Sequence, residues 1–117
     1  MKRLTLIALL IVIVFIGCTK STDSNQNTTT TPAACTGTKT FSSDVSPIIQ
    51  SVCATSGCHN AGSTNGPGPL TTYQQVFNAR TQIRSAVSTG LMPKNGTLTS
   101  DQKAAITCWI DAGATNN

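Results

Sequence analysis

The sequence has few aromatic residues, little charge and a single histidine. Phenylalanine, tryptophan and tyrosine make up 4% of the 117 residues, charged residues make up 10%, and His59 is the only histidine. The lysines and arginines are scattered, so the sequence predicts no nucleic-acid partner. So few large side chains do not bury enough apolar surface to stabilise a small fold unaided. Some further stabilising element is therefore expected.

The sequence also lacks internal repeats and the alternation of apolar and polar residues that β-strands need. Its apolar residues recur at helical spacing instead, which predicts an all-α fold. A first helix is expected within 41–52, because capping residues and a proline suit its first turn, and it should end at Cys53. A second helical pattern begins at Thr71 or Thr72 and continues or restarts as far as Gly90.

The last helix has the clearest signals. Thr99 and Gln102 form a capping-box pattern, and Gly113 follows the last apolar residue as a stop signal. One apolar face is expected from Ala105, Ile106, Trp109 and Ile110. The segments between the helices, 60–70 and 91–96, are rich in glycine and proline and are predicted to be loops.

The first residues are typical of a targeting segment. A positive start at Lys2 and Arg3 precedes an uncharged apolar run that is too short to cross the ~30 Å core of a bilayer comfortably. Residues 1–17 are therefore predicted to be a signal peptide. The end of the run, Phe15-Ile16-Gly17-Cys18, resembles the lipobox of bacterial lipoproteins, in which the cysteine is acylated and becomes the mature N-terminus.

That resemblance implies an exported protein, anchored in a membrane through a lipid on Cys18 and facing the periplasm or the cell surface. The alternative is an ordinary signal peptide with a chance cysteine. Thr19 to Ala34 has no large apolar side chain, so it cannot offset its ordering entropy by burial. We therefore expect residues 18–40 to form the lipidated N-terminus and a flexible tether, followed by one domain.

Five cysteines are present, and assigning Cys18 to the lipid leaves four in an oxidising compartment. The segment Cys53-Ala-Thr-Ser-Gly-Cys58-His59 resembles the attachment motif of haem c, with four residues between the cysteines where two is usual. The resemblance implies that both thiols form thioethers with the haem vinyl groups and that the imidazole is the proximal iron ligand. Haem c would then be the stabilising element that the composition requires.

Two other interpretations of these residues stay open. Cys53 and Cys58 could form a disulfide beside a solvated His59, or the three side chains could bind zinc with a fourth ligand from Cys35 or Cys108. If the haem motif holds, Cys35 and Cys108 are left as a distant pair, and a disulfide between them is the simplest expectation. Such a disulfide would join the start of the domain to its last helix.

A haem electron carrier needs a sixth iron ligand, and Met92, followed by Pro93, is the candidate because the only other methionine is the initiator. The alternative role of Met92 is to fill a gap in the core. The order of helix, Cys-Cys-His motif, Gly-Pro loop, helices, Met-Pro loop and final helix resembles the class I cytochrome c domain. The final helix ends as Trp109-Ile110-Asp111-Ala112-Gly113-Ala114, and the resemblance covers 41–114.

This resemblance implies a small helical domain packed around one covalent haem, with axial ligation by His59 and Met92. It implies that the protein is not an enzyme but transfers single electrons between a redox donor and an acceptor protein while iron cycles between ferric and ferrous. Two alternatives remain. One is a haem enzyme or gas sensor with an open sixth site, and the other is a haem-free, disulfide-stapled binding lipoprotein.

Overall fold

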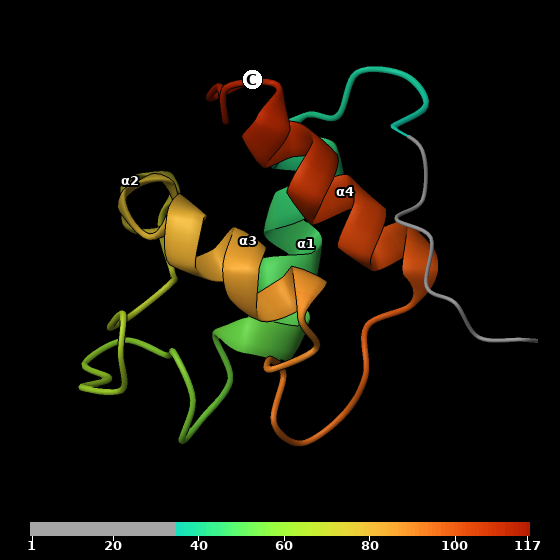
Figure 1. Cartoon of the computed structure of the whole chain (residues 1–117). Helices are drawn as coiled ribbons and strands as arrows, with labels where there is room; N and C mark the ends of the chain where they lie inside the picture. Colours follow the sequence, from blue (N-terminus) through green and yellow to red (C-terminus); the bar gives the residue numbers. More distant parts are fainter. Residues whose placement is uncertain (1–34) are drawn as a thin grey trace, which may run out of the picture.

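The computed structural model describes residues 35–117, and these form helices joined by loops, with no strand among them (Figure 1). The all-α prediction is thus confirmed for this part of the chain. The signal peptide, Cys18 and the segment 19–34 lie outside the described residues. None of the helices that are described is both long and apolar enough to cross a membrane. The elements are η1 (Phe41–Val45), α1 (Ser46–Ile48), η2 (Ile49–Cys53), α2 (Tyr73–Asn78), α3 (Arg80–Ser88) and α4 (Ser100–Asp111).

The first helical segment runs without a break through η1, α1 and η2. Thr40 caps it, because its hydroxyl accepts a hydrogen bond from the Ser43 N–H, and the Asp44 carboxylate accepts one from the Thr40 N–H at 2.7 Å. Val45 and Ile49, one turn apart, are fully buried. Both ends of the segment have π-helical hydrogen bonding, which the sequence pattern did not indicate. The segment ends at Cys53, as predicted.

The second helical pattern restarts rather than continues. Thr72 and Gln75 form a capping box that begins α2. The chain leaves helical geometry at Ala79, which has φ −91° and ψ 1°, and α3 begins at the next residue. This break turns α3 across the domain, so that it packs against both α2 and α4.

The last helix, α4, has the boundaries that its signals predicted. The Thr99–Gln102 capping box is formed, and Gly113, with φ 103°, follows the end of the helix. Trp109 is 1% exposed, and its ring centroid lies 5.4 Å from that of Phe41. Tyr73 lies 5.1 Å from Phe41 in turn, so the aromatic side chains of the described residues gather in one cluster between α4, η1 and α2.

Both ends of the described chain are fixed to this helical core. Cys35 forms the expected disulfide with Cys108 of α4, which closes a sequence separation of 73 residues. At the other end, the Asn117 carbonyl accepts a hydrogen bond from the Ser42 N–H, and its side chain accepts one from the Phe41 N–H. Residues 35–40, assigned to the tether from the sequence, are therefore attached to the domain.

The disulfide should supply a large share of the stability. Replacing Cys35 with serine and the buried Cys108 with alanine should lower the free energy of unfolding by about 4 kcal/mol, because a loop of this length restricts the unfolded chain strongly. Urea unfolding of the two proteins without reductant measures the difference. Equal midpoints would contradict a stabilising role.

Candidate functional site

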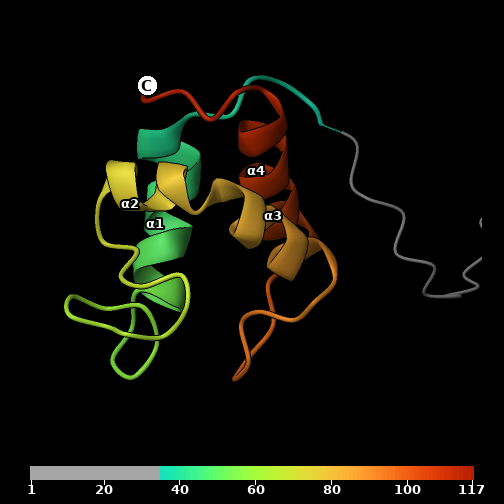
Figure 2. The same ribbon diagram turned by 60° about the vertical axis from the view of Figure 1, so that its left-hand side comes forward.

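Two adjoining cavities, of about 570 and 610 Å³, are lined by residues of the loops after η2 and after α3. Both loops lie at the same end of the domain (Figure 2). We call the two spaces the paired cavities. Both are lined by Cys53, His59, Gly66 and Met92. The first is mostly apolar and extends along α3, where Ile83, Ala86 and Val87 form its wall. The second is bordered by the inter-cysteine loop and by Pro93, Lys94 and Asn95. No aromatic side chain lines either one.

His59 is held by hydrogen bonds from both its backbone and its ring. Its N–H donates to the Cys53 carbonyl at 3.0 Å, and its own carbonyl accepts from the Leu70 N–H at 2.8 Å. The ring nitrogen Nδ1 lies 2.9 Å from the Gly68 carbonyl oxygen. Because a carbonyl can only accept, Nδ1 must donate, which leaves Nε2 as the nitrogen that can bind a further partner.

The accessibility of Nε2 follows from the burial of polar atoms. His59 is 8% exposed, and no sealed polar side-chain atom in residues 35–117 lacks a hydrogen-bond partner. Nε2 has no such partner among these residues, so it keeps some exposure, and His59 lines both of the paired cavities. An imidazole fixed through one nitrogen and open at the other has the arrangement of a metal ligand. A solvated surface histidine, the alternative considered from the sequence, is not what the structure contains.

Cys53 and Cys58 are half-buried free thiols that line the same space. They are not joined to each other, in contrast to the disulfide alternative. The four residues between them turn at Gly57, which has φ 78°, a conformation that glycine adopts without strain. Burial raises the pKa of the Cys53 thiol, and the neighbouring Cys58 raises it further. Cys53 is therefore a neutral thiol at neutral pH.

Met92 reaches the paired cavities from the loop after α3. It is half-buried, and its backbone N–H donates to the Ala86 carbonyl of α3 at 3.2 Å. The peptide bond that joins it to Pro93 is cis. The structure thus brings the four residues predicted from the sequence, Cys53, Cys58, His59 and Met92, to one site. They come from the end of η2, the loop after it and the loop after α3.

Sequence reasoning missed two polar residues that shape this site. The Asn65 side-chain amide donates to the carbonyls of Gly57 and Cys58, each at 3.0 Å. The Ser63 hydroxyl also donates to the Cys58 carbonyl and accepts from the Asn65 N–H at 3.2 Å. Asparagine in a loop commonly bonds to nearby backbone, but the sequence does not indicate which carbonyls it bonds.

Lys94 is the one lysine, arginine, aspartate or glutamate among the residues that line the paired cavities. Arg84 pairs with Asp111 through bonds of 2.6 and 3.0 Å, and Arg80 donates to the Phe77 carbonyl and lies over the Phe77 ring. Neither arginine lines the paired cavities.

No alternative set of metal ligands comes together among the described residues. Among the described residues, no group of three or more His, Cys, Asp or Glu side chains could hold a metal ion. The closed zinc site considered from the sequence therefore has no ligand set in this part of the chain. Comparison with protein-family models, with curated proteins and with solved structures gave no match for this chain.

Proposed function

We propose that this chain is a membrane-anchored monohaem c-type cytochrome that transfers single electrons and chemically changes no substrate. The observation that carries the proposal is His59, fixed through Nδ1 by the Gly68 carbonyl and open at Nε2, at cavities that Met92 also lines. Such a fixed tautomer is the usual arrangement of an iron-binding histidine. Export through residues 1–17 and lipidation of Cys18 complete the proposal.

The residues present fit haem c. Cys53 and Cys58 would each add a thiol S–H across a vinyl C=C, so that sulfur bonds to one carbon and hydrogen to the other, with no oxidant consumed. His59 and Met92 would be the axial ligands. When bound, the haem iron supplies the one-electron couple, and a thioether ligand favours its ferrous form. The chain contributes orientation, exclusion of water and the choice of ligands.

The distribution of large side chains supports a cofactor at this end of the domain. The aromatic cluster fills the space between α4, η1 and α2, whereas the paired cavities have no aromatic wall. Their volumes lie within the roughly 300–1,000 Å³ of ordinary ligand sites. A buried apolar macrocycle would give α3 and the two loops a surface to pack against, and would add the stability that the composition lacks.

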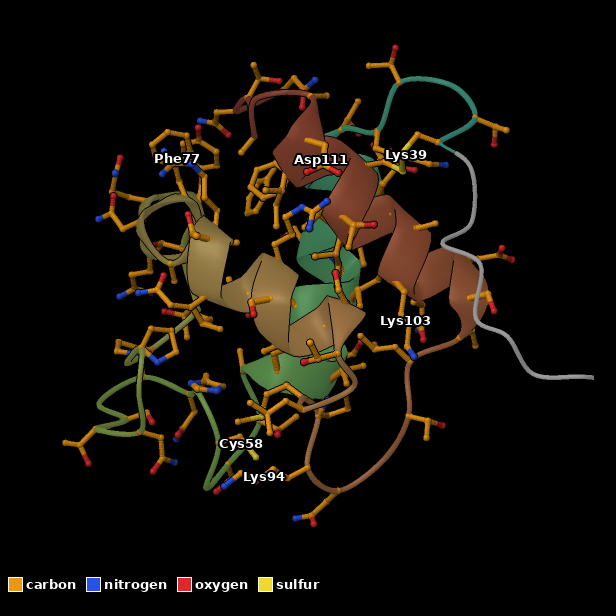
Figure 3. The ribbon with its side chains drawn as sticks, viewed as in Figure 1. Lys39, Cys58, Phe77, Lys94, Lys103 and Asp111 are labelled. Carbon is orange, nitrogen blue, oxygen red and sulfur yellow. A yellow bond between two sulfur atoms is a disulfide. The ribbon has the colours of Figure 1, made fainter. Side chains whose placement is uncertain are left out.

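The redox partners would bind at the end of the domain that carries the paired cavities. Cys58 and Lys94 lie close together there, while Lys39, Phe77 and Asp111 lie toward the opposite end (Figure 3). Leu91, which borders the first cavity, is 64% exposed and is the one large apolar side chain so exposed among the described residues. A small surface of this kind fits the weak, low-area contacts of transient electron-transfer pairs.

A redox titration of the full chain, produced with haem c maturation machinery, tests the proposal. We expect a reversible one-electron transition and a low-spin ferric spectrum that added cyanide or imidazole changes only slowly, because Met92 occupies the sixth position. High-spin ferric iron that binds these ligands at once would contradict the electron carrier and favour an enzyme or gas sensor with an open site. A colourless protein would favour the haem-free binding lipoprotein.

A further inference from the structure

Asn65 stands between the inter-cysteine loop and the carbonyl that fixes His59. Its side-chain nitrogen donates to the Gly57 and Cys58 carbonyls, at the end of that loop. Its backbone carbonyl accepts a hydrogen bond from the Gly68 N–H. The Gly68 carbonyl in turn accepts the hydrogen bond of the His59 ring. One residue therefore connects the second cysteine of the motif to the partner of the imidazole.

Ser63 adds a second contact to the same arrangement. Its hydroxyl donates to the Cys58 carbonyl, so that carbonyl has two donors, and it accepts from the Asn65 N–H. Ser63 also bonds through its own N–H to the Asn60 carbonyl. We call the side chains of Ser63 and Asn65, with the carbonyls of Gly57 and Cys58, the Asn65 bracket.

The Asn65 bracket restrains the loop between the two cysteines of the motif, which is longer than the usual two residues. Each residue in a loop adds conformational freedom that must be lost when the loop is fixed, and here four residues separate the cysteines. Inside the loop, the Cys58 N–H bonds to the Thr55 carbonyl and restrains one turn. The side-chain donors that bind its carbonyls from outside come from Ser63 and Asn65.

We propose that Asn65 is a positioning residue that holds Cys58 and the His59 imidazole in one fixed arrangement, so that the second thioether forms and the iron ligand keeps its orientation. This inference rests on the proposed function. An amide suits the role because its nitrogen carries two hydrogens, one for each carbonyl. A carboxylate has the same shape but no hydrogen to donate, and it would repel both carbonyl oxygens.

The test compares four full-length proteins matured in the same host: wild type, Asn65→Ala, Asn65→Asp and Asn116→Ala. Asn116 is the control because it is an exposed asparagine that lines neither cavity and makes no side-chain hydrogen bond within the described residues. Peptide mass mapping gives the ratio of chains attached at both cysteines to chains attached at Cys53 alone. The midpoint potential is measured on the fully attached fraction.

We expect the ratio to fall roughly tenfold in Asn65→Ala, the lower end of what loss of an outer partner of a metal ligand costs, and further in Asn65→Asp. The potential should rise, because a less firmly held Nδ1 hydrogen bond makes imidazole a weaker donor to ferric iron. Asn116→Ala should match wild type in both measurements.

If the wild type holds haem through both cysteines and Asn65→Ala equals Asn116→Ala in ratio and potential, the inference about Asn65 is wrong and the proposed function stands. A fall in yield with an unchanged ratio and potential would likewise contradict it, since that is the mark of a merely structural residue. If the wild type carries no covalent haem, the proposed function fails, and the inference fails with it.

Discussion

Chains in which Cys53 and Cys58 are both replaced by serine should carry no covalent haem. A serine hydroxyl does not form the bond that the thiols are proposed to form with the vinyl groups, so the cofactor would be held only by its axial ligands and by packing. Extraction with acidified acetone distinguishes covalently attached haem from haem held only by its axial ligands and by packing. Haem should stay with the wild-type polypeptide and pass into the organic phase from the double variant, a change from nearly complete retention to none.

Single variants and the structural disulfide provide the controls. Cys53→Ser and Cys58→Ser should each retain haem through the remaining thioether. The variant lacking the Cys35–Cys108 disulfide should retain haem through both, because that disulfide joins the domain start to α4 and lines neither cavity. Covalent haem that survives in the double serine variant would contradict the assignment of Cys53 and Cys58.

Replacement of Met92 by leucine should convert the ferric protein from low spin to high spin and lower the midpoint potential. Leucine has nearly the same volume and leaves the fold intact, but it has no sulfur to bind iron. Loss of the thioether removes a ligand that favours ferrous iron, so we expect a fall of roughly 0.2 V within the range of about 0.8 V that axial ligands span. Electron paramagnetic resonance and potentiometry measure the two changes.

The neighbouring Leu91 supplies a control for disturbance of this loop. It borders the first cavity and is exposed, so Leu91→Ala alters the same segment without touching a proposed ligand. We expect its spin state to match that of wild type. If Met92→Leu also stays low spin with an unchanged potential, then Met92 fills space in the core, and the sixth ligand is another residue or none.

The helix boundaries show where sequence signals suffice and where they do not. Those of α4 follow from local chemistry, because Thr99, Gln102 and Gly113 each act on backbone groups within one turn. The break at Ala79 is different. Apolar spacing alone does not tell one long helix from two short ones whose faces meet the same core, so the sequence left both possibilities open.

The π-helical hydrogen bonding of η1 and η2 is also absent from the sequence pattern. A helical apolar stripe such as Val45 and Ile49 looks the same whether each N–H bonds to the fourth or the fifth preceding residue. The end of the segment at Cys53 was still predictable, because the apolar spacing stops there.

Sequence signals likewise identified some residues of the candidate site and missed others. Cys53, Cys58 and His59 were found because reactive side chains at short spacing form a recognisable motif, and Met92 was found because no other internal methionine exists. Asn65 was missed because its role depends on a fold of the loop that brings it back to Gly57 and Cys58. The Gly68 carbonyl was missed because every residue has one, and only the structure shows which carbonyl accepts from the imidazole.

A pyridine haemochrome spectrum shows whether haem is covalently attached to the chain. The full chain is expressed with haem c maturation machinery, denatured and reduced in alkaline pyridine, and its visible spectrum is recorded. We expect a c-type haemochrome band that stays with the polypeptide after denaturation. A folded, exported protein with no such band would contradict the proposed covalent attachment, and the domain would then be better explained as a disulfide-stapled binding module.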